Sequence, residues 1–405
     1  MVKVAIVHDW LTGMRGGERC LEAFLKLYPE ADVFTLVHVP GASSTLIDSR
    51  VKGVSFLNSI PGIARVYRAC LPLFPLAIRS LNIKGYDLVI SLSHAVAKNV
   101  KVEPGVPHVC YCFTPMRYIW DQARSYFSGV SYFLAQPVIR AFRWWDISAA
   151  KRVTEFVAIS SFVSARIRRF YGRRSVVIAP PVRMQTDSSV ALTSTEREVF
   201  AAEDKFYLCA GALVPYKRVE VAVAACSRLG LNLWVVGKGP ELDKLVKIAG
   251  PSVRFFGHVS EAFLWEAYRR CEALLFPGVE DFGIVPVECL ASGRPVIAID
   301  AGGVSETVQG WKFLPGAPIE PERYSGILLS KKLVGSSVAF AEAIQTFSDN
   351  KEKFVSDRIV RNAESFSYAI FFQQWQRLAK QLNIWPGAEI SDCSRSNERG
   401  LNEIG

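Results

Sequence analysis

Two glutamates, Glu280 and Glu288, lie eight residues apart in a setting that suits the binding of a sugar phosphate. A carboxylate accepts hydrogen bonds through both of its oxygens, so each glutamate can hold two neighbouring hydroxyl groups. A helix is expected to begin between them near Ile284, where unpaired backbone N–H groups and the helix dipole bind phosphate. The order of these groups predicts a ligand in which a diphosphate separates a sugar from a ribose.

The elements that must position these groups can be identified on either side of them. A strand is expected to end at Pro277-Gly278. Pro286 suits the first turn of the following helix, where its missing N–H costs nothing, and Gly293 suits the helix end. The helix would then begin at the carboxyl end of a parallel strand, which is where open α/β sheets bind phosphate-bearing ligands.

The whole chain alternates short β-branched runs with amphipathic stretches, which predicts an α/β protein with two doubly wound parallel sheets. In the first half, strands are expected at Val2–His8, Val33–Val39, Asp87–Leu92, His108–Cys112 and Phe156–Ile159, and helices at Glu18–Tyr28 and Ser160–Phe170. In the second half, strands are expected at Phe206–Ala210, Leu233–Val236, Val253–Phe256, Ala273–Phe276 and Val296–Ile299, with helices between them. The Ser- and Thr-rich stretch 184–198 is expected to be the linker.

The chain carries a net charge of +10, and the charge is unevenly placed. Residues 1–190 contain 24 Lys and Arg against 12 Asp and Glu, and the remainder contains 24 against 26. This asymmetry predicts an anionic partner for the first half. No nucleic-acid recognition motif accompanies the charge, so an anionic membrane surface is the preferred partner over nucleic acid.

Several protein classes fit the composition poorly. The nine cysteines and five histidines lack the spacing of a disulfide framework or a metal site, which favours a reduced, cytoplasmic compartment. No signal peptide and no bilayer-spanning run is expected.

The aromatic and basic stretch 118–152 has two interpretations. It could form core helices through Phe133, Leu134, Phe142 and Trp145, or an interfacial helix with Arg140, Arg143, Lys151 and Arg152 on anionic lipid.

Two further motifs follow Glu280 and Glu288, and together they resemble the signature of retaining glycosyltransferase family 4. They are Gly293-Arg294-Pro295-Val296-Ile297 and Ala301-Gly302-Gly303-Val304-Ser305-Glu306. The resemblance implies the GT-B fold, in which two Rossmann-like domains face a central cleft, and a reaction without metal or other cofactor. It implies an acceptor-binding domain at 1–190, a nucleotide-sugar-binding domain at 199–365 and a C-terminal helix at 366–384 that returns to the first domain. Residues 385–405 are expected to form a disordered tail.

The resemblance also implies roles for residues of the second half. Glu280 would contact the donor sugar and Glu288 the nucleotide ribose, and Lys217 would neutralise the leaving diphosphate. Many family members have an arginine where this chain has Ala212, and Arg218 is the candidate substitute. The remaining donor-binding residues implied are Asp281, Phe282, Gly283, Ile284 and Val285 around the diphosphate, and Gly237, Gly239, Gly257, His258 and Val259 around the base and ribose.

In the first half, the resemblance implies that Gly16 and Gly17 face the diphosphate and that His94 lies near the transferred sugar. The motif around Arg117, Tyr118, Trp120 and Asp121 is similar to an acceptor-side motif of bacterial mannosyltransferases of surface-polysaccharide assembly. Each feature also has a simpler interpretation. The glutamates could be surface residues, Lys217 could cap a helix, His94 could be a satisfied core histidine, and the glycine pair could serve a turn.

The implied reaction is transfer of mannose from GDP-mannose to a lipid-linked oligosaccharide, at the inner face of the cytoplasmic membrane, in lipopolysaccharide or exopolysaccharide synthesis. No dedicated nucleophile stands out, so the resemblance implies a front-face mechanism in which the leaving diphosphate helps to deprotonate the acceptor. The alternatives are a UDP-sugar donor, a sugar-nucleotide epimerase on the same fold, and a membrane-associated scaffold without activity.

Overall fold

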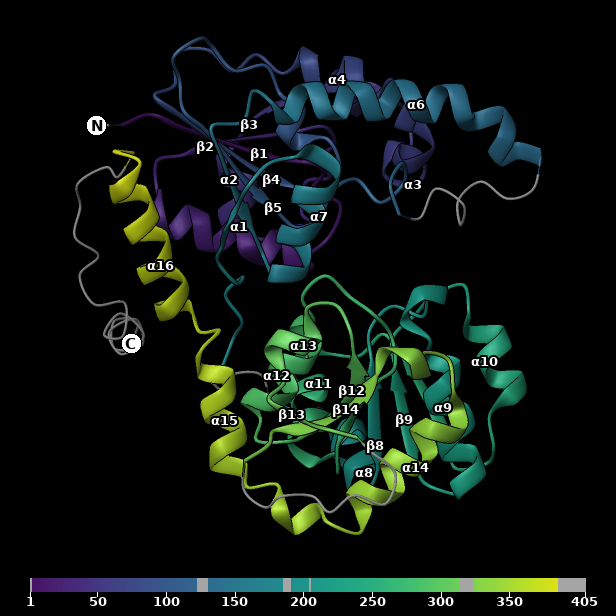
Figure 1. Ribbon diagram of the computed structural model, residues 1–405. Helices are drawn as coiled ribbons and strands as arrows, with labels where there is room; N and C mark the ends of the chain where they lie inside the picture. Colours follow the sequence, from purple (N-terminus) through teal and green to yellow (C-terminus); the bar gives the residue numbers. More distant parts are fainter. Residues whose placement is uncertain (1, 122–129, 185–190, 204, 314–322, 385–405) are drawn as a thin grey trace. The chain divides into compact units, whose positions relative to one another are not determined.

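The computed structural model describes residues 2–121, 130–184, 191–203, 205–313 and 323–384 (Figure 1). These residues form two compact units, and each unit contains a seven-stranded sheet. The first unit comprises described residues up to 159, then 163–181 and 368–384, and the second comprises 160–162 and 182–367. All strand pairs in both sheets are parallel, so the predicted pair of doubly wound sheets is confirmed.

The first sheet has the strand order β3-β2-β1-β4-β5-β6-β7. Its strands are β1 (Val4–His8), β2 (Asp32–Thr35), β3 (Val51–Val54), β4 (Leu88–Ser93), β5 (His108–Cys112), β6 (Glu155–Ala158) and β7 (Val176–Val177). Every residue of β1, β4 and β5 is buried, as expected of central parallel strands covered on both faces. The chain runs outward from β1 to β3 on one side and then returns to β4 on the other. The topological switch point therefore lies between β1 and β4.

The second sheet has the order β10-β9-β8-β11-β12-β14-β13, and its switch point lies between β8 and β11. Its strands are β8 (Tyr207–Ala210), β9 (Leu233–Val236), β10 (Val253–Gly257), β11 (Leu274–Phe276), β12 (Val296–Asp300), β13 (Gly310–Lys312) and β14 (Gly326–Ser330). Its main helices are α8 (Ser194–Ala201), α9 (Val219–Leu229), α10 (Leu242–Ile248), α11 (Glu261–Arg270), α12 (Ile284–Ala291), α13 (Val304–Thr307), α14 (Ser337–Ser348) and α15 (Ser356–Glu364).

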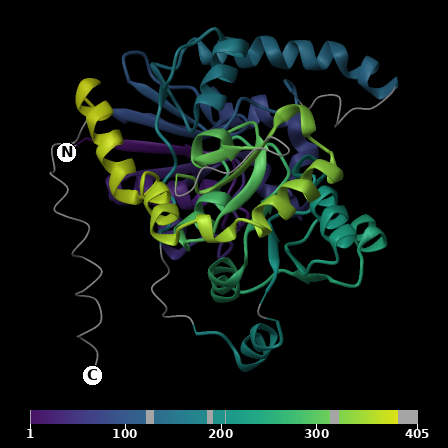
Figure 2. The same ribbon diagram turned by 60° about the horizontal axis from the view of Figure 1, so that its bottom comes forward.

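The helices of the first unit include α1 (Gly16–Leu27), α2 (Thr45–Arg50), α3 (Ile63–Val66), α4 (Phe74–Ser80), α6 (Val130–Ala150), α7 (Ser161–Tyr171) and α16 (Tyr368–Gln381). A 3₁₀ segment, η2 (Tyr67–Leu73), joins α3 to α4. The long helix α6 is clear in both ribbon views (Figures 1 and 2). None of the described helices is long and apolar enough to cross a membrane.

The C-terminal helix α16 belongs to the core of the first unit, as predicted (Figure 1). The indole of Trp375 is fully buried and donates a hydrogen bond to the hydroxyl of Tyr28 at 3.0 Å. The ring of Trp375 also packs edge-on against Phe24 of α1, with centroids 4.6 Å apart. Apolar burial of this kind is the main favourable contribution to folding.

Part of the stretch expected to be a linker is helical. Helix α8 starts after Thr193, whose side chain accepts from the backbone N–H of Glu196, while the Glu196 carboxylate accepts from the backbone of Thr193. This reciprocal capping box stabilises the helix start, and the buried side chain of Phe200 packs the helix against Trp234. The predicted tail at 385–405, residues 122–129 and 185–190, and the side chains of Phe133 and Leu134 lie outside what the structure describes.

Candidate functional site

Lys217 and Glu280 form an ion pair at the switch point of the second sheet. Lys217 ends a single 3₁₀ turn that follows β8, and Glu280 lies in the loop that follows β11. The ammonium nitrogen lies 2.8 Å from Oε1 of Glu280, and the two side chains are 14% and 18% exposed. The structure therefore brings together the two residues for which the sequence predicted catalytic roles at the diphosphate and the donor sugar.

The surroundings of this pair keep Lys217 protonated. Burial alone would lower the pKa of Lys217, but the charge of Glu280 and its hydrogen bond together raise that pKa above its usual value. Apart from this ammonium group, no described residue donates a hydrogen bond to the buried Oε1 of Glu280. The pair thus offers a positive charge for an anionic group and a carboxylate oxygen for a hydroxyl group.

Glycines allow the loops around Lys217 to approach one another closely. A Cβ atom at Gly237, after β9, would lie 1.9 Å from the carbonyl oxygen of Gly211, after β8. A Cβ at Gly239 would lie 2.1 Å from the carbonyl oxygen of Leu213, which is also in the loop after β8. A Cβ at Gly278 would lie 2.7 Å from the Cα of Lys217. Side chains at these positions would force the loops apart, so the predicted residues Gly237 and Gly239 have a clear steric purpose.

The loop that follows β12 holds the main chain of Glu280. The N–H of Gly303 donates to the carbonyl oxygen of Glu280 at 2.8 Å. A Cβ at Gly302 would lie 2.2 Å from that same oxygen. The Gly302-Gly303 pair therefore fixes the backbone that presents the Glu280 side chain, which is a role that the motif alone did not reveal.

Helix α12 begins at Ile284, four residues after Glu280, with Gly283 at its N-cap. The φ angle of Gly283 is +92°, a left-handed conformation that favours glycine. Asp281 and Phe282 are buried, whereas Ile284 and Val285 are partly exposed at the start of the helix. The predicted phosphate-binding amides therefore lie next to the Lys217–Glu280 pair in sequence and at the same end of the sheet.

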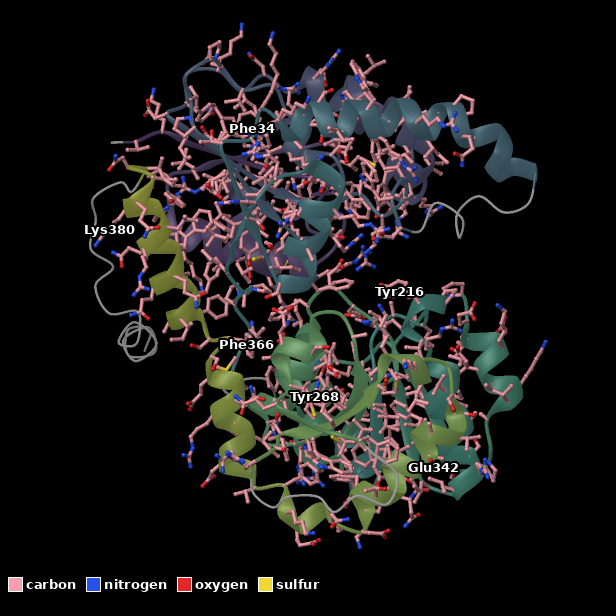
Figure 3. All side chains as sticks on the ribbon, in the orientation of Figure 1. Phe34, Tyr216, Tyr268, Glu342, Phe366 and Lys380 are labelled. Carbon is pink, nitrogen blue, oxygen red and sulfur yellow. The ribbon has the colours of Figure 1, made fainter. Side chains whose placement is uncertain are left out.

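Glu288 is buried on α12 and is only 5% exposed. One of its carboxylate oxygens accepts a hydrogen bond from the hydroxyl of Tyr268 of α11 at 3.1 Å. The Tyr268 side chain lies inside the second unit (Figure 3). Because Glu280 and Glu288 are both largely shielded from solvent, the interpretation that they are ordinary surface glutamates is wrong.

The other predicted donor-binding residues lie on two neighbouring loops. The N–H of Gly237 donates to the carbonyl oxygen of Gly257 at 2.7 Å, which joins the ends of β9 and β10. His258 follows Gly257 and is exposed, and Val259 is partly exposed. Arg218 is also exposed, and its guanidinium group lies 3.4 Å from Glu220.

In the first unit, a fully buried aspartate organises the loop that carries His94. The carboxylate of Asp9, just after β1, accepts hydrogen bonds from four consecutive backbone N–H groups after β4. The donors and their distances are His94 at 2.7 Å, Ala95 at 2.9 Å, Val96 at 2.6 Å and Ala97 at 2.7 Å. Asp9 therefore joins the two strands that flank the switch point of this sheet.

Asp9 also orients the imidazole of His94. Its carboxylate lies 3.1 Å from Nδ1 of His94, an arrangement that places the proton on Nδ1 and leaves Nε2 as an acceptor. Burial lowers the pKa of His94, Asp9 opposes this effect, and the charge of Arg117 adds to it. The ring of Trp10 lies edge-on at 4.4 Å between centroids. With 28% of its side chain exposed, His94 is not a fully buried core histidine.

His8, the last residue of β1, is the buried histidine of this cluster. Its Nδ1 lies 3.0 Å from the carbonyl oxygen of Trp10, and burial lowers its pKa to about 4, so the ring is neutral near pH 7. A Cβ at Gly17 would lie 3.3 Å from Nε2 of His8. Gly17, with Gly16 at the start of α1, therefore permits a close approach to β1, and a role at a ligand stays a prediction.

Trp120, predicted on the acceptor side, belongs to a buried polar network. Its indole N–H donates to Asp146 at 2.9 Å, and the hydroxyl of Tyr171 donates to the same carboxylate at 2.8 Å. The ammonium group of Lys98 forms an ion pair with Asp146, and both side chains are almost fully buried. Trp120 therefore contributes to the internal structure of the first unit.

The other residues predicted on the acceptor side have different surroundings. The carboxylate of Asp121 forms an ion pair with Arg166 of α7. Tyr118 lines a groove of the first unit, and Arg117 is close enough to His94 to affect its pKa. Among the described residues, no group of three or more His, Cys, Asp and Glu side chains could hold a metal ion.

Comparison with known proteins finds a family that is similar to the second unit. Residues 193–365 match the family described as "Glycosyl transferases group 1". The chain is 30% identical over 146 residues to the glycogen synthase of Mycobacterium tuberculosis, which covers 33% of this chain and 35% of that protein. It is 28% identical over 216 residues to a GDP-mannose-dependent alpha-(1-6)-phosphatidylinositol monomannoside mannosyltransferase of the same species, covering 46% of this chain and 56% of that protein. The chain thus spans only part of the length of these relatives.

Solved structures match nearly the whole chain. The structure of HepE from Anabaena in complex with UDP and glucose has a TM-score of 0.64 and 19% identity, covering 94% of this chain and 99% of that one. A sucrose-phosphate synthase from Thermosynechococcus elongatus has a TM-score of 0.68 and 18% identity, covering 95% and 99%. At such identities the similarity shows the fold alone, and it confirms the predicted GT-B fold.

Proposed function

We propose that this chain is a retaining glycosyltransferase of the group 1 family, because residues 193–365 match that family and the chain has the GT-B fold. We further propose that it transfers mannose from GDP-mannose to a lipid-linked oligosaccharide or polysaccharide precursor. The observation that carries the proposal is the Lys217–Glu280 ion pair at the switch point of the second sheet, with Glu280 in the loop that leads into α12.

In this proposal, the second unit binds the nucleotide sugar. The N–H groups at the start of α12 and the ammonium group of Lys217 bind the diphosphate. The carboxylate of Glu280 accepts hydrogen bonds from the sugar, and that of Glu288 accepts them from the ribose. The glycine loops after β8, β9 and β10 hold the base, because their close packing leaves the backbone itself as the binding surface.

The chemical step follows from the groups available. A double displacement would need a carboxylate at the anomeric carbon. In the mechanism that we propose, the acceptor hydroxyl attacks on the face from which the diphosphate departs, and a diphosphate oxygen takes the acceptor proton. Lys217 stabilises the negative charge that grows on the leaving group, and its raised pKa keeps it charged for this purpose. His94, with Nε2 as an acceptor, is proposed to bind a hydroxyl of the transferred sugar.

The acceptor is proposed from the charge and surface of the first unit. Its positive charge favours an anionic membrane surface, and the protein would act as a peripheral protein on the cytoplasmic side. The mannosyltransferase of Mycobacterium tuberculosis named above acts, by its name, on a phosphatidylinositol mannoside, which supports a lipid acceptor here.

A UDP-sugar donor is the second candidate. It is favoured by the structural similarity to HepE, which was solved with UDP and glucose. A GT-B sugar-nucleotide epimerase is a third candidate, and it would release an epimerised product in the absence of any acceptor. The candidates differ in what they bind and in whether they need a lipid.

Two measurements test the proposal. Thermal unfolding with GDP, UDP and ADP should show the largest stabilisation with GDP, because only a ligand that binds the folded state raises its stability. Incubation with radiolabelled GDP-mannose and membrane extract should give a labelled lipid-extractable product. The absence of such a product from any nucleotide sugar would refute the transferase proposal, and a larger shift with UDP would refute the mannose assignment.

A further inference from the structure

An apolar groove of about 460 Å³ lies in the first unit. The residues that line it are far in sequence from Lys217, Glu280 and Glu288. It is lined by residues of η2, of α6 and of the segment after β5, and these include Ala69, Leu71, Tyr118, Val138 and Phe142. Its volume falls within the roughly 300–1,000 Å³ of typical ligand pockets, and most of its lining is apolar. Arg68 is the one charged residue of the lining.

The elements beside the groove expose large apolar side chains to solvent. On the side of α3, η2 and α4, Val66 is 47% exposed, Leu73 is 40% exposed and Leu76 is 60% exposed. On α6, Val138 is 54% exposed and Trp144 is 73% exposed. Val138 lines the groove itself, and the others lie on elements that line it or adjoin it in the chain. Exposed apolar side chains that cluster mark a site for an apolar partner, whereas isolated ones are common.

The charge around the groove is positive. Residues 49–86 contain six Lys and Arg and no Asp or Glu. Arg65, Arg68 and Arg79 of this stretch are exposed. On α6, the one acidic residue is Asp146, which is fully buried. A partner that covers this groove must therefore combine an apolar part with negative charge.

The groove also connects to the His94 cluster through aromatic contacts. Tyr67 of η2 packs against Trp10 with ring centroids 5.0 Å apart, and Trp10 packs against His94 at 4.4 Å. The charge of Arg68 is close enough to lower the pKa of His94. A phosphate group bound by Arg68 would therefore lie near the histidine that we assign to the sugar.

We propose that this groove binds the hydrocarbon chain of a lipid phosphate, the lipid end of the acceptor, with Arg68 at its phosphate group. The inference rests on the proposed function for the identity of the acceptor. It goes further in locating one lipid-binding site, in assigning the chain and the phosphate to different residues, and in separating this site from general attraction to a charged surface.

The test is isothermal titration of the full chain with monomeric dodecyl phosphate and, separately, with inorganic phosphate. Dodecyl phosphate should bind at one saturable site, and inorganic phosphate should bind far more weakly. Ala69→Phe fills the groove from an exposed position, so it should weaken dodecyl phosphate binding about tenfold, as expected when two methylene groups lose their contacts. Ala64→Phe is the matched control, because Ala64 is exposed on α3 but does not line the groove, and it should change affinity by about twofold at most.

A second variant, in α6 rather than in η2, keeps the proposal testable if Ala69→Phe fails to fold. Val138→Glu introduces a negative charge at an exposed groove position and should also weaken binding. Equal affinity of the wild type, Ala69→Phe and Val138→Glu, or equal affinity for both ligands, would overturn the proposal. The proposal is also overturned if the wild type does not bind dodecyl phosphate and Ala69→Phe raises the unfolding temperature. These two results together would mean that the groove is a packing defect that a side chain of the protein fills. Stabilisation by GDP is measured in parallel, so that a failed groove and a failed transferase proposal are distinguished.

Discussion

Replacing Lys217 with methionine removes the positive charge of the Lys217–Glu280 pair and keeps most of the side-chain volume. The pair has a separation of 2.8 Å, and its members are 14% and 18% exposed. Loss of the ammonium group leaves the Glu280 carboxylate largely buried without its partner. Breaking a fully buried pair costs about 3–5 kcal/mol, and with this partial exposure we expect a loss of about 2 kcal/mol in the free energy of unfolding.

The expected loss of activity is larger than this loss of stability explains. A positive charge that acts on a developing anion contributes about 10²–10³-fold to kcat. The double variant Lys217→Met/Glu280→Gln removes the unpaired carboxylate, so its stability should return most of the way to wild type. Its activity should not return, because neither variant supplies a cation to the leaving diphosphate.

The assay measures kcat with radiolabelled donor and the thermal unfolding midpoint for the wild type, both single variants and the double variant. Lys244→Met is the matched control, since Lys244 pairs with Glu241 at 2.9 Å but is 74% exposed. It should leave kcat unchanged. If Lys217→Met retains kcat within a few-fold, or if the double variant recovers activity together with stability, the pair is structural and the reasoning fails.

Three other changes have definite expected outcomes. Asp9→Asn removes the charge that raises the pKa of His94, so an NMR titration should show this pKa falling further. The acidic limb of the pH–rate profile should then move to lower pH, and an unmoved profile would contradict the role of His94. Gly237→Ala places a Cβ against a main-chain oxygen, so it should lower the unfolding temperature and weaken GDP binding far more than Gly230→Ala, since Gly230 also has a positive φ but has open space around it. Burial raises the pKa of Glu18 from 4.5 to about 6, so the folded state holds the proton more tightly than the unfolded chain. The resulting stability is present below pH 4.5 and is lost as the pH rises through 6, by about 2 kcal/mol, and Glu18→Gln should reduce that loss in urea unfolding at pH 4.5 and 7.

The sequence predicted the Glu280 region well because its signals are local. A proline–glycine pair, a proline in the first helical turn and a terminal glycine define one strand, one loop and one helix, and the structure contains β11 and α12 at these positions. The alternation of strands and helices also led to both parallel sheets. Strands β13 and β14 were not predicted, because their stretch of sequence breaks the pattern in which short β-branched runs alternate with amphipathic segments.

Asp9 was not predicted, and its case shows what local patterns cannot reveal. A single aspartate after a strand has no distinctive spacing, and its partners are main-chain groups about 85 residues away, at positions 94–97. The only available signal was its place at the end of the first predicted strand. Trp120 shows the opposite case. Its motif suggested ligand binding, whereas its indole N–H is satisfied inside the protein by Asp146.

The return of α16 to the first unit affects how this protein can be divided. Apart from the short segment 160–162, the second unit consists of residues 182–367, and Trp375 then completes the first core. A single cut between the units would give an amino-terminal piece without the indole that packs on Phe24, and a carboxyl-terminal piece with an unpaired apolar helix. Most of the second unit, residues 182–367, can be excised as one continuous segment, but the first unit can be obtained intact only by rejoining its last helix through a new connection.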